Sequence, residues 1–370
     1  MLIGIDASRA NKPIKTGVEW YSYHVIEQLK KMAPAEVKFL LYTGEALTGG
    51  LEICPVNFLE KHLVWLPKYL WTQIRLWWEL LLNPPDVLFV PAHTIPFLFL
   101  SKKIKVAVTV HDVGFKRFPE LYKRIQYWYH ELTMWRIKRR ADIILTVSEF
   151  SKQEIVKLYN ILPDKITVAP LGFDASQYNK QSNQSADVLH YYGITTPYLL
   201  YVGRIERKKN VIRMVEAFNI LAKSNSQLKL VLAGGDGNEL HNIKQKIADY
   251  KLENRILLLG YVKKEHLPII MSSAVIFLFP TLYEGFGIPI LEAMACGVPV
   301  VTSNINPHQE VAGVAAVLAD AKSEKDLAEK IAELLADEVK RKELIIKGLE
   351  RVKDFSWEKT AKIILARLLK

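Results

Sequence analysis

The chain has 370 residues, of which 50% are hydrophobic and 24% are charged, and its formal net charge is +11. This length favours two domains over a single hydrophobic core, and the composition is that of a soluble globular protein rather than a disordered or fibrous one. No apolar run reaches the roughly 18 residues of a membrane-spanning helix, which argues against an integral membrane protein. Cys54 and Cys296 lie far apart with no metal-ligand spacing, so a reducing, cytoplasmic compartment is expected.

Short apolar, β-branched runs alternate with helical patterns through the first half, which predicts a parallel sheet with crossover helices. The chain opens directly on a predicted strand, without the basic leader of a signal peptide. Helices are predicted from about Val18, and from near Ser148 as a plausible N-cap. The predicted strands of this half are Leu2–Asp6, Val37–Tyr42, Val87–Val90, Lys105–Val110, Ile143–Val147 and Lys165–Val168.

The polar, weakly patterned stretch from Asn179 to about His190 predicts a linker between two domains. The strand–helix alternation then restarts. Its predicted strands are Tyr198–Val202, Lys229–Ala233, Ile256–Leu259, Val275–Phe279 and Val298–Val301. The predicted helices start at Val211, near Asn238 and at Pro289, and continue over 324–335, 338–352 and 357–370.

The most informative stretch follows the predicted strand that ends at Phe279. A glycine-containing turn leads to Pro289, which suits the first position of a helix. Free backbone N–H groups at that helix start, approachable because glycine has no side chain, are suited to a phosphate or a polar sugar edge. Glu284 in the turn and Glu292 in the helix can each accept hydrogen bonds from hydroxyl pairs of a sugar or ribose. A turn residue and a helix-terminal charge are the plainer alternatives.

A second candidate stretch lies directly after the first strand of the second half. Gly203 ends this strand at its carboxyl edge, where open α/β sheets bind their ligands. Arg204 offers a guanidinium fork and Lys209 a point charge, which together suit a diphosphate. A solvated basic loop is the alternative, and the position at a strand's carboxyl end weakens it.

Weaker signals lie in three further loops. His111, followed by Asp112, lies at a strand's carboxyl end, where active-site residues gather, although a single histidine is more often structural. Gly17 opens the first predicted helix and is a weak phosphate-loop signal. The glycine-rich stretch from Ala233 to Asn238 lacks the full spacing of a dinucleotide-binding loop and predicts a turn.

Basic residues are concentrated between residues 101 and 140, which contain eleven Lys or Arg against three Asp or Glu. Aromatic residues are interleaved with them at 122–129, and another aromatic stretch lies at 71–78. This combination suits an anionic membrane surface, whereas no nucleic-acid-binding motif accompanies it. A solvated basic face is the alternative, in which the tryptophans belong to the core. The tryptophans concerned are Trp71, Trp77, Trp128 and Trp135.

Together these stretches resemble a glycosyltransferase of family 4, also called glycosyl transferases group 1, with the GT-B fold and retention of anomeric configuration. The resemblance spans nearly the whole chain, and its specific part is the Glu284–Glu292 spacing combined with Arg204 and Lys209. It implies two Rossmann-like α/β domains facing across a cleft. These are residues 1–178 on the acceptor side and 195–353 for the nucleotide sugar, with a final helix, 357–370, packing back on the first.

The resemblance also implies roles for individual residues. The residues implied to be catalytic are His111, Arg204, Lys209 and Glu284. Those implied to bind the donor are Gly17, Gly203, Tyr261, Val262, Gly285, Phe286, Gly287, Ile288 and Glu292. In this scheme Arg204 and Lys209 hold the diphosphate and neutralise the charge that develops on it, so neither a metal nor a further cofactor is expected. Glu292 is implied to bind the ribose hydroxyls, and His111 is implied to reach the reacting sugar.

The implied substrates are a GDP- or UDP-linked hexose and a glycan or polyprenyl-linked acceptor. The stretch from His111 to Glu120 resembles mannosyl- and rhamnosyltransferases of surface polysaccharide assembly, which favours mannose. A cytoplasmic enzyme, peripheral on the inner face of the membrane, is the expected setting. One departure is Gly17, a single glycine where many members have two, so the backbone approach to the phosphates differs.

Three alternative functions fit these residues less well. A nucleotide-sugar 2-epimerase shares the fold but lacks the Glu284–Glu292 spacing with its glycine turn. A non-catalytic glycan- or nucleotide-binding protein is expected to lose Arg204, Lys209 or Glu284, and all three are present. A dehydrogenase is disfavoured because no complete Gly-x-Gly-x-x-Gly follows the first strand.

Overall fold

The computed structural model describes residues 1–65, 70–179 and 185–370. The chain divides into two compact units, and each is described by itself. The first comprises Met1–Gly172 together with Ser356–Lys370, and the second comprises Phe173–Phe355.

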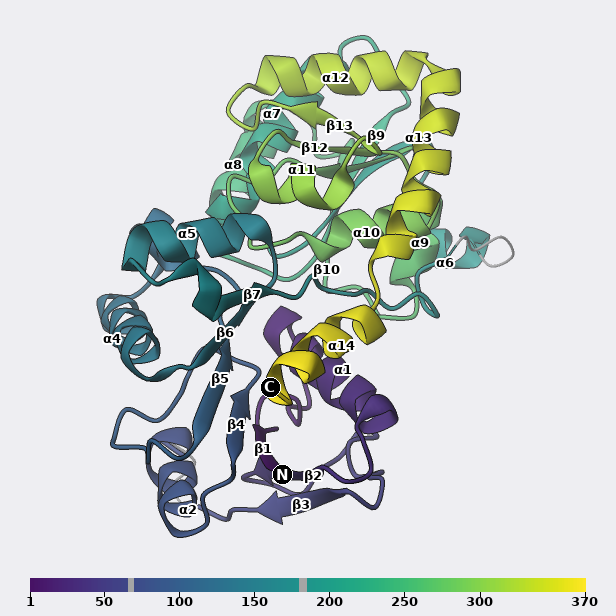
Figure 1. The fold of residues 1–370 in the computed structure, drawn as a ribbon. Coiled ribbons are helices and arrows are strands. Elements are labelled where there is room, and N and C mark those ends of the chain that lie inside the picture. The colour runs from purple at the N-terminus through teal and green to yellow at the C-terminus, as the bar shows by residue number, and fades with distance from the viewer. Residues whose placement is uncertain (66–69, 180–184) are drawn as a thin grey trace. The chain divides into compact units, whose positions relative to one another are not determined.

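The first unit is built on a seven-stranded parallel sheet in the order β3-β2-β1-β4-β5-β6-β7 (Figure 1). Its strands are β1 (Leu2–Asp6), β2 (Lys38–Thr43), β3 (Phe58–His62), β4 (Val87–Val90), β5 (Lys105–Thr109), β6 (Ile143–Thr146) and β7 (Ile166–Val168). The central strands are almost entirely buried, as expected for a parallel sheet with helices on both faces. The strand order reverses between β1 and β4, and ligands of such sheets bind outside the carboxyl ends at this point.

Helices cover this sheet because each carries an apolar face. In α1 the residues Tyr21, Val25, Ile26 and Leu29 recur at helical spacing and are buried. The helices are α1 (Gly17–Met32), the π-helical turn η1 (Thr72–Leu76), α2 (Trp77–Leu82), α3 (Gly114–Arg117), η2 (Pro119–Leu121), α4 (Arg124–Arg140), α5 (Glu149–Tyr159), η3 (Pro163–Lys165) and α14 (Trp357–Leu368). Ser148 caps α5 by accepting a hydrogen bond from the Ser151 N–H at 3.0 Å, as predicted.

The last helix, α14, packs on α1. The Trp357 ring stacks on His24 with centroids 4.9 Å apart and an interplanar angle of 12°. The Thr360 hydroxyl donates to the carbonyl of Pro170 at 2.5 Å. The end of the chain is therefore fixed to the first unit.

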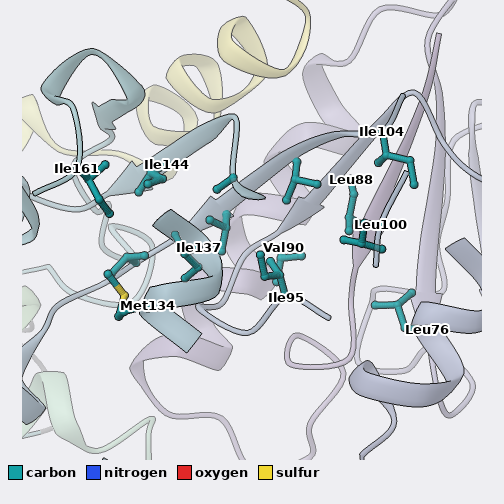
Figure 2. Packing of buried hydrophobic residues seen from close by; sticks show 14 of the residues in the cluster. Leu76, Leu88, Val90, Ile95, Leu100, Ile104, Met134, Ile137, Ile144 and Ile161 are labelled. Atoms are coloured by element: carbon teal, nitrogen blue, oxygen red, sulfur yellow. The ribbon is translucent and has the colours of Figure 1, made fainter. Parts of the chain in front are cut away.

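The main apolar core of this unit lies between β4–β6 and the segments around α2 and α4 (Figure 2). Leu88 and Val90 of β4, Met134 and Ile137 of α4, and Leu76 are at most 2% exposed. This packing fixes one side of α4 and leaves its other side outside the core.

The second unit is built on a six-stranded parallel sheet in the order β10-β9-β8-β11-β12-β13. Its strands are β8 (Tyr198–Val202), β9 (Lys229–Ala233), β10 (Ile256–Gly260), β11 (Ile276–Phe279), β12 (Val300–Ser303) and β13 (Ala316–Ala319). Its helices are α6 (Ser185–Tyr191), η4 (Arg207–Lys209), α7 (Val211–Leu221), α8 (Leu240–Asp249), α9 (Leu267–Ser272), α10 (Ile288–Ala295), α11 (Asn306–Ala312), α12 (Glu324–Ala336), α13 (Glu338–Arg351) and η5 (Val352–Asp354). The strand order reverses between β8 and β11, so the loops after these two strands meet.

The structure corrects the sequence predictions in two places. The edge strands β3 and β13 were not predicted, because neither carries a continuous buried apolar run: only Phe58 is buried in β3 and only Ala319 in β13. The predicted linker 179–190 is wrong from Ser185 onward, where α6 forms and buries Leu189 beside α9. Residues 180–184 of that linker lie outside the described residues.

No helix in the described parts of the chain combines the length and apolarity needed to cross a membrane.

Candidate functional site

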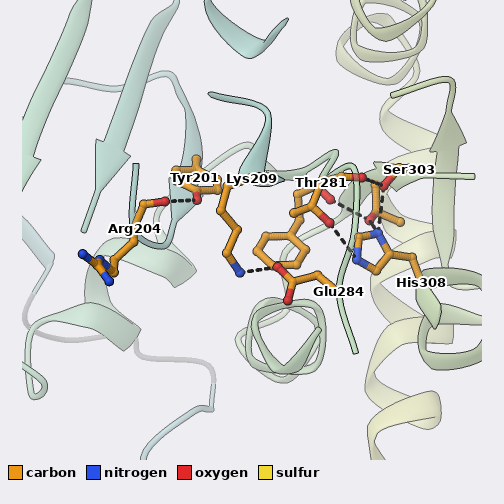
Figure 3. Close-up of polar contacts among 9 residues, drawn as sticks. Tyr201, Arg204, Lys209, Thr281, Glu284, Ser303 and His308 are labelled. Carbon is orange, nitrogen blue, oxygen red and sulfur yellow. Dashed lines mark hydrogen bonds and ion pairs between the residues drawn. The ribbon is translucent and has the colours of Figure 1, made fainter. Parts of the chain in front are cut away.

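The two loops at the switch point of the second sheet bring Lys209 and Glu284 into an ion pair (Figure 3). Their side chains are only 18% and 14% exposed. The Lys209 ammonium also lies 5.5 Å from the centroid of the Phe279 ring at the end of β11. Because the charges are only partly solvated, their attraction is stronger than in a surface pair.

Backbone and side-chain contacts hold these loops together. Asn210, which is 3% exposed, donates to the carbonyl oxygens of Pro280 at 2.9 Å and Ala321 at 2.6 Å. The Leu282 N–H donates to the carbonyl of Lys208 at 2.8 Å. The hydrogen bonds of its two neighbours, Lys208 and Asn210, therefore fix the backbone position of Lys209.

Arg204 lies on the same loop but is not part of the ion pair. Its side chain is 66% exposed, and its Nη1 lies 3.1 Å from Glu206. Figure 3 shows its guanidinium apart from the Lys209–Glu284 pair. The start of this loop packs closely against the loop after β9. A Cβ on Gly234 of that second loop, which has φ +144°, would lie 2.1 Å from the carbonyl oxygen of Gly203. The predicted Arg204–Lys209 pair therefore has one fixed cation and one solvent-exposed cation.

The turn from Gly285 to Ile288 leads into α10, with Pro289 in its first turn. Gly287 has φ +109°, a conformation that side-chain-bearing residues rarely adopt. Phe286 is buried at 3% exposure and packs edge-on against Phe355. Pro289 has no N–H, and the Ile290 N–H donates to the carbonyl of Gly287 at 3.0 Å, so any backbone donation to an anion at this helix start comes from residues before Pro289.

A buried histidine, His308 of α11, is hydrogen-bonded to the loop that carries Glu284 (Figure 3). Its Nε2 lies 3.2 Å from the Thr281 hydroxyl, and its Nδ1 lies 2.8 Å and 2.9 Å from the hydroxyls of Thr302 and Ser303. Burial, together with the nearby Lys209 charge, lowers the pKa of His308 to about 3. A neutral imidazole therefore links β12 to the loop that carries Glu284.

Glu292 lies one turn into α10 and is half-buried. Burial raises the pKa of Glu292 to about 7, while a hydrogen bond from Tyr178 and the charge of Lys264 act in the opposite direction. Tyr261 follows β10 and is 80% exposed, whereas its neighbour Val262 is 7% exposed. The second unit thus offers a carboxyl group at Glu292, an exposed aromatic ring at Tyr261 and a buried apolar side chain at Val262.

The candidate residues of the first unit lie at the carboxyl edge of its own sheet. His111 follows β5, and its Nε2 donates to the carbonyl of Pro91 at 3.2 Å. Its ring packs edge-on against Tyr21 at 4.6 Å, and burial lowers its pKa. Gly17 begins α1, and no atom lies within 4 Å of a Cβ placed there, so this helix start is uncrowded. Gly17 and His111 belong to the first unit, whereas the other predicted residues belong to the second.

The chain matches two protein families that together cover most of its length. Residues 15–177 match Glycosyltransferase Family 4, and residues 193–351 match Glycosyl transferases group 1. The chain is 35% identical over 266 residues to the O-antigen chain mannosyltransferase B of Escherichia coli, covering 71% of this chain and 70% of that protein. The chain is a family 4 glycosyltransferase.

Further relatives and solved structures agree with this assignment. The O-antigen chain mannosyltransferase RfbU of Salmonella typhimurium is 27% identical over 251 residues, which cover 68% of this chain and 65% of that protein. The sucrose-phosphate synthase structure from Thermosynechococcus elongatus superposes with a TM-score of 0.75 at 19% identity, covering 100% of this chain and 99% of that one. The glycosyltransferase therefore has the GT-B fold, and its family makes it a retaining hexosyltransferase. This decides the open alternatives against the epimerase and the non-catalytic protein.

Two residues of the glycosyltransferase site were not predicted from its sequence. Folding of distant segments brings His308 to Thr281, in the loop that carries Glu284, and Tyr178 to Glu292. Neither stands in a strand-end motif, so no spacing pattern distinguishes them. Among the described residues, no group of three or more His, Cys, Asp or Glu side chains is arranged to hold a metal ion.

Proposed function

We propose that this glycosyltransferase transfers mannose from GDP-mannose to a lipid-linked glycan during the assembly of a surface polysaccharide, at the cytoplasmic face of the membrane. The 35% identity to an O-antigen chain mannosyltransferase over 71% of the chain is the observation that carries this proposal. A second O-antigen mannosyltransferase with 27% identity supports the same sugar. UDP-linked sugars are the alternative donors, since the similar structure of HepE from Anabaena is a complex with UDP-glucose.

In this proposal the donor binds at the carboxyl edge of the second sheet. Lys209 and Arg204 bind the diphosphate, and the N–H groups of residues 285–288 contact the distal phosphate and the sugar. Glu284 accepts hydrogen bonds from sugar hydroxyls. To do so, it exchanges its ion pair with Lys209 for contacts to the donor. Because Gly203 has no side chain, its loop can approach the donor diphosphate closely.

The ribose and the base have partners on the same unit. Glu292 accepts the ribose hydroxyls, and Tyr261 and Val262 lie beside the base. In the first unit, the backbone at Gly17 approaches the phosphates and His111 contacts the reacting sugar. The neutral His111 ring donates from Nε2 to a fixed carbonyl, which leaves Nδ1 as an acceptor.

Charge neutralisation is the main catalytic contribution that these residues make. As the glycosidic bond breaks, negative charge grows on the leaving diphosphate, and cations placed beforehand stabilise it without reorganisation. Lys209 is such a cation, because its loop is anchored and its side chain is largely screened from water. Arg204 supplies the second charge, so we propose that the reaction proceeds without a metal ion.

The raised pKa of Glu292 predicts a pH dependence of donor binding. With a pKa of about 7, Glu292 is mostly protonated at pH 6 and mostly ionised at pH 8. Because the carboxylate accepts both ribose hydroxyls, the affinity for GDP-mannose is expected to rise up to roughly tenfold over this range. Titration calorimetry is the measurement, and the sugar nucleotide has no phosphate that titrates in this window.

The Glu292→Gln variant is the control for this titration. It keeps the shape of the side chain and removes the titrating group, so its affinity is expected to be flat between pH 6 and pH 8. An equal slope for both proteins would show that another group controls binding.

A transfer assay tests the proposed function. The enzyme is incubated with GDP-mannose or UDP-glucose and a polyprenyl-linked glycan, with and without EDTA. Mannose incorporation that EDTA leaves unchanged is the expected result. Transfer from UDP-glucose alone would overturn the proposed donor, and loss of activity that only added metal restores would overturn the charge assignment.

A further inference from the structure

The outer face of α4 is apolar although it lies at the surface. Ile125, Trp128, Leu132 and Trp135 are 84%, 63%, 45% and 48% exposed. They recur every three or four residues, so they form one stripe along the helix. The opposite side of α4, including Met134 and Ile137, is buried in the core. The helix is thus apolar on two faces, and folding of the unit accounts for only one of them.

Neighbouring segments extend this stripe. Arg136 of α4 donates to the carbonyl oxygens of Pro96 at 3.1 Å and Leu98 at 2.5 Å, which holds the loop after β4 against the helix. In that loop Phe99 is 68% exposed. The carbonyl of Phe99 accepts a hydrogen bond from Trp77 Nε1 at 2.8 Å, which joins the loop to α2. Figure 1 shows α2 and α4 along the same flank of this unit.

The exposed apolar side chains of α2, a helix joined to this loop by the Trp77–Phe99 hydrogen bond, are included in what we call the aromatic face. Trp78 and Leu82 are 53% and 62% exposed. The face is defined by Trp78, Leu82, Leu98, Phe99, Ile125, Trp128, Leu132 and Trp135. Of the four tryptophans whose burial was the alternative interpretation, Trp128 and Trp135 are therefore on the surface.

Positive charges border the aromatic face. Lys123 and Arg124 lie at the start of α4, and Lys138 and Arg139 at its end, all exposed. The Arg139 guanidinium lies 4.1 Å from the centroid of the Trp135 ring. The acidic residue of α4, Glu131, forms an ion pair with Lys116 at 2.7 Å, which offsets its charge.

We propose that the aromatic face is a docking surface for an anionic lipid bilayer. Tryptophan and phenylalanine rings settle at head-group depth, and lysine and arginine beside them attract anionic head groups. A second copy of the chain is a poorer occupant, because a symmetric contact would bring these like-charged borders together. Binding of this kind depends on both charge and apolar insertion, so it weakens with salt but does not vanish.

This inference deepens the proposed function, on which it rests for the lipid-linked acceptor. A reactive glycan carried on a lipid stays within reach of an enzyme bound to the same bilayer. Docking therefore raises the effective concentration of the acceptor without any new contact at the site.

Cosedimentation with vesicles tests the docking surface. The wild-type enzyme is compared with the Trp128→Ala/Trp135→Ala double variant on vesicles of phosphatidylcholine alone and of equal parts phosphatidylcholine and phosphatidylglycerol. Wild-type binding to the anionic vesicles is expected, with at least a roughly tenfold weaker association for the double variant. At about 1 M salt, where the Debye length is about 3 Å, wild-type binding is expected to fall but remain measurable.

The matched control is Val339→Ala/Ile346→Ala on α13, whose side chains are 77% and 69% exposed and which belongs to the second unit. Its vesicle binding is expected to equal that of the wild type. Absent or equal binding to both vesicle types, or undiminished binding of the double variant, would overturn the proposal. A concentration-dependent dimer that the double variant abolishes would overturn it in favour of self-association.

Activity separates failure of docking from failure of the proposed function. On a water-soluble glycan acceptor the double variant is expected to keep wild-type turnover, whereas on an acceptor embedded in anionic vesicles it is expected to lose about tenfold. Vesicle binding without mannose transfer would refute the proposed donor alone. Mannose transfer without vesicle binding would refute the docking surface alone.

Discussion

The Lys209→Met variant is expected to lose on the order of a hundredfold to a thousandfold in turnover, the cost of removing one preorganised charge-stabilising group. Methionine keeps an unbranched side chain of similar length and removes the ammonium, which lies 5.5 Å from the Phe279 ring centroid and pairs with Glu284. The affinity for GDP is expected to fall as well, because the same charge binds the diphosphate in the ground state. Steady-state kinetics and calorimetry with GDP measure the two effects.

The control for this variant is Lys244→Met, on the exposed surface of α8. It makes the same chemical change away from the switch-point loops, so turnover is expected to stay at the wild-type level. Removing Lys209 also leaves the partly buried Glu284 unpaired, which destabilises the fold. Thermal unfolding must therefore show a folded variant at the assay temperature. A folded Lys209→Met protein with more than about a tenth of wild-type turnover would refute the assignment.

Glu284→Gln is expected to lower turnover by on the order of a hundredfold without weakening GDP binding. In the free enzyme Glu284 competes with the donor diphosphate for the Lys209 ammonium. Neutralising the carboxylate removes that competitor, so the affinity for GDP is expected to stay unchanged or rise. Both variants thus lower turnover, but only Lys209→Met lowers nucleotide affinity.

This difference in nucleotide affinity provides an internal control. A purely structural ion pair would make both variants less stable and lower GDP affinity in both. Equal losses of affinity in Lys209→Met and Glu284→Gln would therefore contradict the proposed exchange of partners. Full turnover in Glu284→Gln would remove the glutamate from the mechanism.

The sequence predicted the central strands because each is a continuous apolar run buried on both faces. The edge strands β3 and β13 have no such signal, since most of their side chains are exposed or only partly buried. Helix α6 lies within a polar stretch and is stabilised by burial of Leu189, which only the folded unit provides. Local patterns thus predict the centre of a parallel sheet better than its borders.

The same limit applies to the site. Lys209 and Glu284 stand in the loops that follow β8 and β11, and parallel strands end at one edge, so the proximity of these two loops was predictable. The ion pair between Lys209 and Glu284 was not predicted, because it depends on how two loops are anchored through Asn210. His308 and Tyr178 act on the site from other parts of the unit, and their neighbours in sequence give no indication of it.

The most direct test of the donor site is a crystal structure of the enzyme with GDP. The diphosphate is expected beside Lys209 and the N–H groups of residues 285–288, the ribose hydroxyls are expected on Glu292, and the Lys209–Glu284 ion pair is expected to be broken. A nucleotide bound elsewhere, or bound here with that ion pair intact, would contradict this expectation.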